Sequence, residues 1–108
     1  MQYSVIVPSA AGAVEAFTPV TASDTFRNTG KTILAVKNGE ATDPVTVTIT
    51  SKVTCNQGYT HDLTVTVAAG ETKFIGPLPT ARFNDPTTDL VTVGYSAVTS
   101  ISAMVLQV

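Results

Sequence analysis

The sequence predicts an all-β protein: an antiparallel β-sandwich, immunoglobulin-like or jelly-roll-like, of about 6–8 short strands with no substantial helix. Three observations predict it. Short segments alternate apolar residues with threonine at a period of two, which indicates strands with one buried face. Turn-forming Gly, Pro, Asn and Asp separate these segments. No stretch of normal helix length carries apolar residues at helical spacing. At 108 residues the chain has room for one such domain.

The clearest strand signal lies in residues 32–50, which contain two strand-like runs around a turn. In the second run, residues 45–49, valine and isoleucine alternate with threonine. Between the runs, Asn38-Gly39 tolerates positive φ and Asp43-Pro44 favours a turn. We therefore expect the two runs to pair with each other as a hairpin.

The first part of the chain is less regular, and we assign residues 1–24 to an N-terminal arm or edge strand and residues 25–108 to the sandwich domain. Two interpretations of the segment around Tyr3 stay open: an edge strand, or an arm that orders only against a partner. Ser23-Asp24 is expected to cap a turn, and Asn28-Thr29-Gly30 to form a turn.

Four more strands are expected along the chain, at residues 63–67, 72–76, 91–96 and 101–108. The last run is apolar on both faces, a pattern typical of a central strand covered on both sides. In a sandwich of this size, another subunit is one candidate for the second cover.

The surface carries little charge, since only 13% of residues are charged, against about 25% in an average soluble domain. Two explanations stay open. In the first, threonine serves as a strand former at solvent-facing positions. In the second, part of the surface is covered by neighbouring subunits, where charge would be costly to desolvate.

The net charge of −2 and the scattered lysines and arginines argue against nucleic-acid binding, which needs a basic stripe. The single cysteine excludes an intrachain disulfide. No basic leader with an apolar run and no stretch of about 18 apolar residues is present, so we expect synthesis in the cytoplasm and no membrane partner.

Three groups of residues resemble chemical sites, and none of them predicts an activity. Gly30-Lys31-Thr32 resembles the end of a phosphate-binding loop, but residue 25 is Thr where the motif needs Gly, and a strand rather than a helix is expected next. The second group lies in one loop and consists of Cys55, His61 and Asp62. It lacks the paired ligand spacing of a zinc site and the rigid scaffold that holds a cysteine nucleophile against its histidine base. We expect no enzyme, no cofactor and no metal.

The third candidate is an oxygen-rich loop containing Asn84, Asp85 and Asp89. Hard oxygen ligands are those that calcium prefers, but the spacing does not match an EF-hand loop. Asp85-Pro86 is ordinary turn chemistry, and we therefore expect no calcium site in this loop.

The order of motifs from residue 25 to the end resembles small β-sandwich structural proteins of tailed bacteriophages, most of all the capsid decoration, or cement, proteins. The resemblance rests on NTGKT (28–32) running into ILAVKNG (33–39), then VTVTI (45–49), AGET (69–72), FIGP (74–77), RFN (82–84) and VTVGYS (91–96).

This resemblance implies a virion protein without catalysis that binds the outer capsid lattice. Its implied partners are the major capsid protein and other copies of itself, with which it forms a homotrimer. The resemblance also implies a location on the capsid surface. From the sequence, the residues expected to contact the capsid or another subunit are Tyr3, Val5, Ile6, Val7, Met104, Leu106 and Val108.

Two alternatives stay open beside the decoration protein. The first is an immunoglobulin-like module of a phage tail or fibre that binds a host surface through loops 51–62 and 82–89. Its candidate contacts are Tyr59, His61, Arg82 and Phe83. The second is a component of the head–tail connector.

Overall fold

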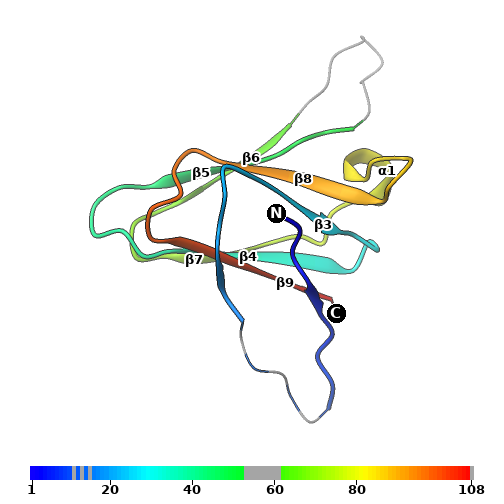
Figure 1. Ribbon diagram of the computed structural model, residues 1–108, viewed down its shortest axis with the longest axis horizontal. Coiled ribbons are helices and arrows are strands. Elements are labelled where there is room, and N and C mark those ends of the chain that lie inside the picture. The colour runs from blue at the N-terminus through cyan, green and yellow to red at the C-terminus, as the bar shows by residue number, and fades with distance from the viewer. Residues whose placement is uncertain (11, 13, 15, 53–61, 108) are drawn as a thin grey trace.

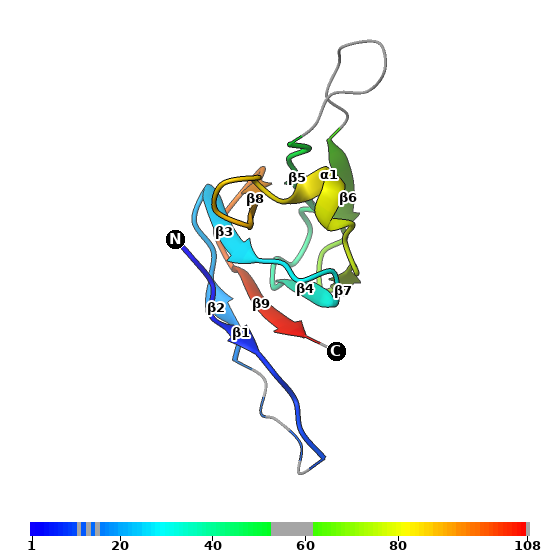
Figure 2. The ribbon, with the colours of Figure 1, turned by 90° about the vertical axis from the view of Figure 1, so that its right-hand side faces the viewer.

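The computed structural model describes residues 1–10, 12, 14, 16–52 and 62–107, and these form two β-sheets packed face to face (Figures 1 and 2). The strands are β1 (Val5–Ile6), β2 (Thr18–Pro19), β3 (Ser23–Arg27), β4 (Thr32–Asn38), β5 (Val45–Ile49), β6 (Leu63–Val67), β7 (Thr72–Ile75), β8 (Leu90–Tyr95) and β9 (Ile101–Gln107). One helical turn, α1 (Thr80–Phe83), is present among the described residues. The predicted β-sandwich is confirmed.

The strands pair as one long antiparallel ribbon that is rolled up. β2 pairs with β9, β3 with β8, β4 with β7, and β5 with β6. Successive sections of this ribbon fall alternately into two sheets, ordered β1-β9-β4-β7, with β2 also on β9, and β3-β8-β5-β6. We call them the β9 sheet and the β8 sheet. This nested connectivity is that of a jelly roll.

The predicted hairpin over residues 32–50 is wrong in its pairing, although both of its strands exist. β4 lies in the β9 sheet and β5 in the β8 sheet, so the chain crosses between the layers. Gly39 does not take positive φ. A Cβ there would lie 2.9 Å from the carbonyl oxygen of Ser100, and the Gly39 amide donates to that oxygen at 2.8 Å. The glycine permits close approach of the turn that precedes β9 rather than a tight reversal.

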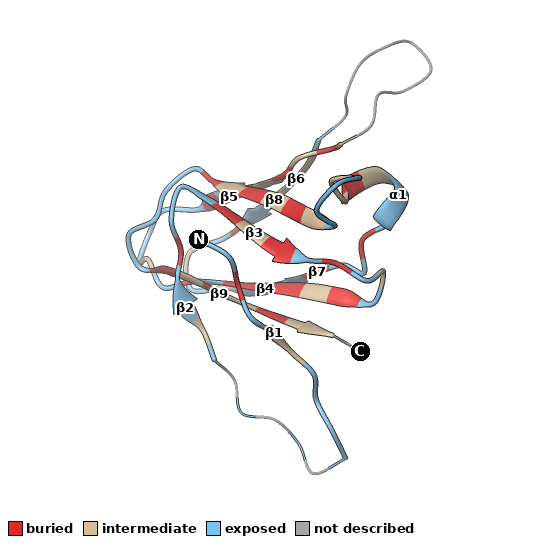
Figure 3. Ribbon diagram, turned by 45° about the vertical axis from the view of Figure 1, so that its right-hand side comes forward, coloured by how far each residue is buried: buried red, intermediate tan, exposed pale blue. Residues whose placement is uncertain are grey.

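Inner faces of both sheets form one apolar core, shown as buried stretches in Figure 3. The predicted alternation is confirmed on β5, where Val45, Val47 and Ile49 are fully buried. β9 is confirmed as a central strand, since it pairs with β4 on one side and with β1 and β2 on the other.

Two buried asparagines hold the corners of the roll. The Asn28 side-chain amide donates to the Leu78 carbonyl and to the Asn84 side chain. The Asn38 side-chain amide donates to the carbonyls of Asp43 and Val67. Asn28, between β3 and β4, is thereby tied to the connection between β7 and β8. Asn38, at the end of β4, is tied to the connection that follows it and to the end of β6.

The sequence did not predict β3, because Asp24 stands at an inward position and breaks its apolar alternation. Asp24 is completely buried. Its carboxylate accepts hydrogen bonds from the Tyr3 hydroxyl and from the backbone amide and hydroxyl of Thr21. Burial raises the pKa of Asp24, but the hydrogen bonds from Thr21 and Tyr3 outweigh burial, and the pKa lies below its ordinary value.

The first six residues join the two sheets. The Tyr3 amide donates to the carbonyl of Thr25 in β3, and Tyr3 is buried against Tyr95, with 2.9 Å between the hydroxyl oxygens. Three residues later, Ile6 pairs with Leu106 in the other sheet. The predicted boundary between residues 24 and 25 falls inside β3.

Candidate docking surface

The outer face of the β8 sheet is covered by hydroxyl side chains. Strand registers place threonines opposite threonines, as in the pairs Thr25–Thr92, Thr46–Thr66 and Thr48–Thr64. Ser23, Arg27, Leu90 and Gly94 complete this face. Such a face can meet water without carrying much charge.

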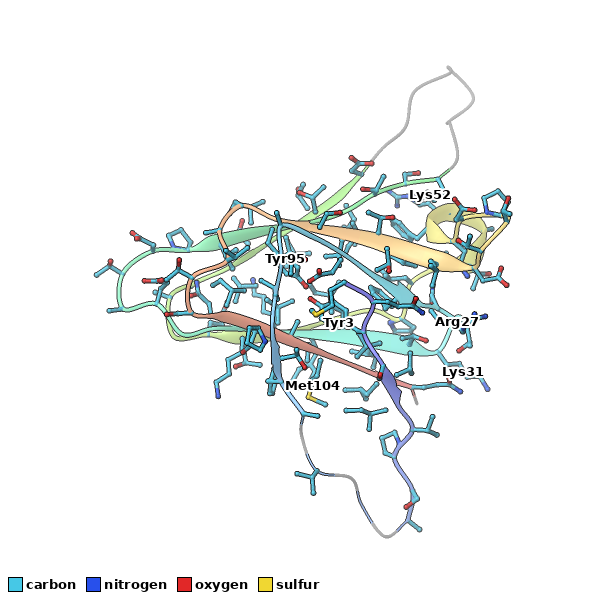
Figure 4. The ribbon with its side chains drawn as sticks, in the orientation of Figure 1. Tyr3, Arg27, Lys31, Lys52, Tyr95 and Met104 are labelled. Carbon is cyan, nitrogen blue, oxygen red and sulfur yellow. The ribbon has the colours of Figure 1, made fainter. Side chains whose placement is uncertain are left out.

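The outer face of the β9 sheet is apolar. Registers align Ile6, Leu106 and Ile33 in one row across β1, β9 and β4, and align Met104, Ala35 and Phe74 in the next row. Phe74 is 68% exposed, although it belongs to a strand. Figure 4 shows the Met104 side chain on the side of β9 that is turned away from the β8 sheet.

A projecting segment borders this apolar face. The described residues between β1 and β2, which are 7–10, 12, 14, 16 and 17, leave the body on the side of the β9 sheet, as Figures 1 and 2 both show. Val14 is 86% exposed and Val7 66% exposed on it. A hollow of about 230 Å³ lies between segment and sheet, lined by Ile6, Pro8, Val14, Phe17, Phe74, Met104 and Leu106. Ala35, in the middle of this face, is completely buried. We call the residues that line the hollow, together with Ile33, the β9 docking surface.

One charged side chain stands among the outward positions of β4, β7 and β9 in the described part of the chain. Lys37 is opposite Ser102 and Thr72 in the register. Its ammonium nitrogen lies 5.6 Å from the centre of the Phe17 ring, within range of a cation–π contact. The lysine therefore sits at the margin of an otherwise uncharged surface.

Three of the contact residues expected from the sequence come together here, namely Ile6, Met104 and Leu106. Val7 is exposed on the projecting segment, while Val5 pairs with Val105 and packs against the core. Tyr3 lies in the core, and Val108 lies outside the described residues.

Sequence reasoning missed the other members of this surface, which are Pro8, Val14, Phe17, Ile33 and Phe74. The signal for Phe74 was present, because it occupies the opposite face of its strand from Ile75, which is buried. For Phe17 and Ile33 the register with β9 and the course of the chain were needed, and neither can be read from local alternation.

The sequence-level chemical candidates do not assemble into a site among the described residues. Gly30 lies in the turn between β3 and β4 with φ of 89°, and the strand β4 follows it where a phosphate-binding loop requires a helix. Cys55, Tyr59 and His61 lie outside the described residues. The Asp62 carboxylate accepts from the Ser51 amide.

The oxygen-rich loop folds on itself. Asp85 accepts from the amides of Thr87 and Thr88, which hold the pKa of its carboxyl below the ordinary value. Asn84 donates to the carbonyl of Asn28. No group of three potential metal ligands was found in the described ranges.

The loop predicted at residues 82–89 begins with the last two residues of α1. The sequence did not predict this helical turn. Pro79 precedes this single turn in an extended conformation. Phe83 is buried in the core, and the Arg82 guanidinium lies 4.6 Å from the centre of its ring. Phe83 is thus not displayed on the surface.

Comparison of the chain with protein-family models, with curated proteins and with solved structures gave no match. Among the described residues, no helix has the length and apolar character needed to cross a membrane.

Proposed function

We propose that this protein is a non-enzymatic structural protein of a bacteriophage virion that binds the outer surface of the capsid and stabilises the shell. The observation that carries the proposal is the β9 docking surface: an apolar sheet face bordered by a projecting segment, on a molecule whose other outer face is covered by threonine. A protein that works by assembly needs such a surface, because burying apolar area against neighbours supplies the binding energy.

The setting comes from the resemblance of residues 25–108 to phage decoration proteins. Jelly rolls also recur in viral capsid domains, which supports the setting by fold analogy alone. On a repeating shell, many weak contacts with the major capsid protein and between copies add through avidity. A modest docking surface is therefore sufficient for stable decoration.

Co-sedimentation with capsids assembled without this protein tests the proposal. Wild-type protein is expected to pellet with capsids and to saturate at a fixed ratio to the major capsid protein. Phe74→Glu is expected to weaken that binding, because it places a carboxylate on the docking surface. Thr66→Glu, on the edge strand of the other sheet, is the matched control and is expected to bind like wild type. Absence of wild-type binding at every concentration would refute the capsid function.

A further inference from the structure

We propose that the partner covering the β9 docking surface is a second copy of this chain. The contact is two-fold, and the projecting segment of each copy lies on the apolar sheet face of the other. This inference rests on the proposed function in one respect: it names the partner of the same surface in solution. The two copies must then separate before that surface meets the capsid, and the two-fold contact replaces the homotrimer that the resemblance implies.

The lack of charge on the surface argues for this partner. A nucleic acid or a strongly acidic protein would require several cations, whereas Lys37 is the one charged side chain at the outward positions described for β4, β7 and β9. The partner must instead be apolar and nearly neutral. In a two-fold contact the same patch faces itself, so a second copy satisfies this condition without further assumption.

The size of the sheet face argues that the projecting segment takes part. Four strands about 4.8 Å apart and up to seven residues long cover about 400 Å². A stable interface needs about 800 Å² on each partner. Docking of the two flat faces alone would therefore fall short, and the segment must be buried in the same contact.

The placement of the segment selects the arrangement. The described residues of the segment leave from β1, at the edge of the sheet, on the side of its outer face (Figure 2). The hollow lies in the corner between these residues and the face. Two such corners related by a two-fold axis interlock, with each segment entering the hollow of the other copy. The apolar side chains that one copy leaves exposed, Val14 and Phe74, are then covered together.

Sedimentation equilibrium of the full chain, without capsids and over a range of concentrations, is the first test. The expected result is a monomer–dimer equilibrium reaching twice the chain mass of 11.2 kDa. A monomer at every concentration would overturn the inference, and so would a trimer, which a two-fold contact does not produce.

Two variants locate the contact. Phe74→Glu and Val14→Glu each place a charge on an exposed position, so both chains are expected to fold and to raise the dimer dissociation constant about 30-fold or more. Thr66→Glu, on the threonine face, and Val98→Glu, at an exposed valine outside the hollow, are the matched controls. A dimer that tolerates both test variants would place the contact elsewhere and overturn the inference.

Mixing variants tests the crossed arrangement itself. Val14→Glu and Phe74→Lys chains are each expected to remain monomeric alone. In a mixed dimer, one crossed contact pairs the introduced glutamate with the introduced lysine and the other keeps both native residues. The mixture is therefore expected to form dimers. A mixture that stays monomeric would show that the projecting segment of one copy does not contact the sheet face of the other, and would overturn the crossed arrangement.

These results separate the inference from the proposed function. Capsid binding by a protein that is monomeric in solution would refute the two-fold contact and leave decoration standing. A dimer that never binds capsids would refute decoration and leave the contact standing.

Discussion

The two outer faces of the sandwich differ in chemistry although the two inner faces are built alike. Val47 on β5 and Leu34 on β4 point into one core and are equally buried. Outside, β5 and β6 present threonine, whereas β4, β7 and β9 present isoleucine, phenylalanine, methionine and leucine. The threonine face shows that this chain can cover a sheet with polar side chains and little charge. The apolar face is therefore a local feature, not a consequence of a composition poor in charge.

The largest effect is expected for a substitution on the inner face of a sheet, in the core. Leu34→Ala on the inner face of β4 should lower the free energy of unfolding by about 3 kcal/mol, because it leaves a cavity in a closed core. Leu106→Ala on the outer face of β9 should cost about 1 kcal/mol, since a partly exposed leucine loses less burial than a core leucine. Urea denaturation at low protein concentration measures both. Equal losses would mean that the outer face is packed like the core.

The next effect concerns the segment that joins the two sheets. Asp24→Asn turns an acceptor of several hydrogen bonds into a partial donor, and should lower the free energy of unfolding by about 1–3 kcal/mol. Tyr3→Phe, which keeps the ring and removes one donor, should cost about 1 kcal/mol. The same denaturation assay compares them. If Asp24→Asn is as stable as wild type, the buried carboxylate does not anchor the first residues.

Acid should weaken the same anchor. The folded pKa of Asp24 lies below its ordinary value, so its stabilising effect is fully present above the unfolded pKa of about 4. It is lost as the pH falls through the folded pKa. Asp85 contributes in the same direction, so wild type is compared with Asp24→Asn at each pH. The variant should show a shallower loss of stability below about pH 4, and parallel curves would argue against this role.

The smallest effect is expected on the exposed edges of both faces. For the isolated monomer, Phe74→Glu and Thr66→Glu should each change the free energy of unfolding by no more than about 0.5 kcal/mol. Thermal denaturation of dilute samples checks this. A large loss for Phe74→Glu alone would mean that Phe74 supports the fold rather than an interface.

Much of the secondary structure could be predicted from the sequence, because alternation reports which face of a strand is buried. The strands over residues 45–49, 63–67 and 101–107 follow from it. Pairing could not be predicted, since a rolled ribbon sends consecutive strands to different sheets and local turn signals do not reveal that crossing. β3 was missed because a buried aspartate, supported by Tyr3 from a distant segment, looks polar in the sequence.

The docking surface could be predicted only in part. Met104 and Leu106 stood out because the last strand is apolar on both faces. Phe74 and Ile33 join them only once the register brings β7, β4 and β9 together. The position of Phe17 depends on the course of the projecting segment, which local patterns do not specify.

The most direct test of the central claim, that the two outer faces serve different roles, is photochemical carbene footprinting of the wild-type protein at increasing concentration, read by mass spectrometry. We predict that labelling of Phe74 and Met104 falls as copies associate, while labelling of the β5 and β6 threonines stays constant. Constant labelling of both faces, or equal protection of both, would contradict the claim.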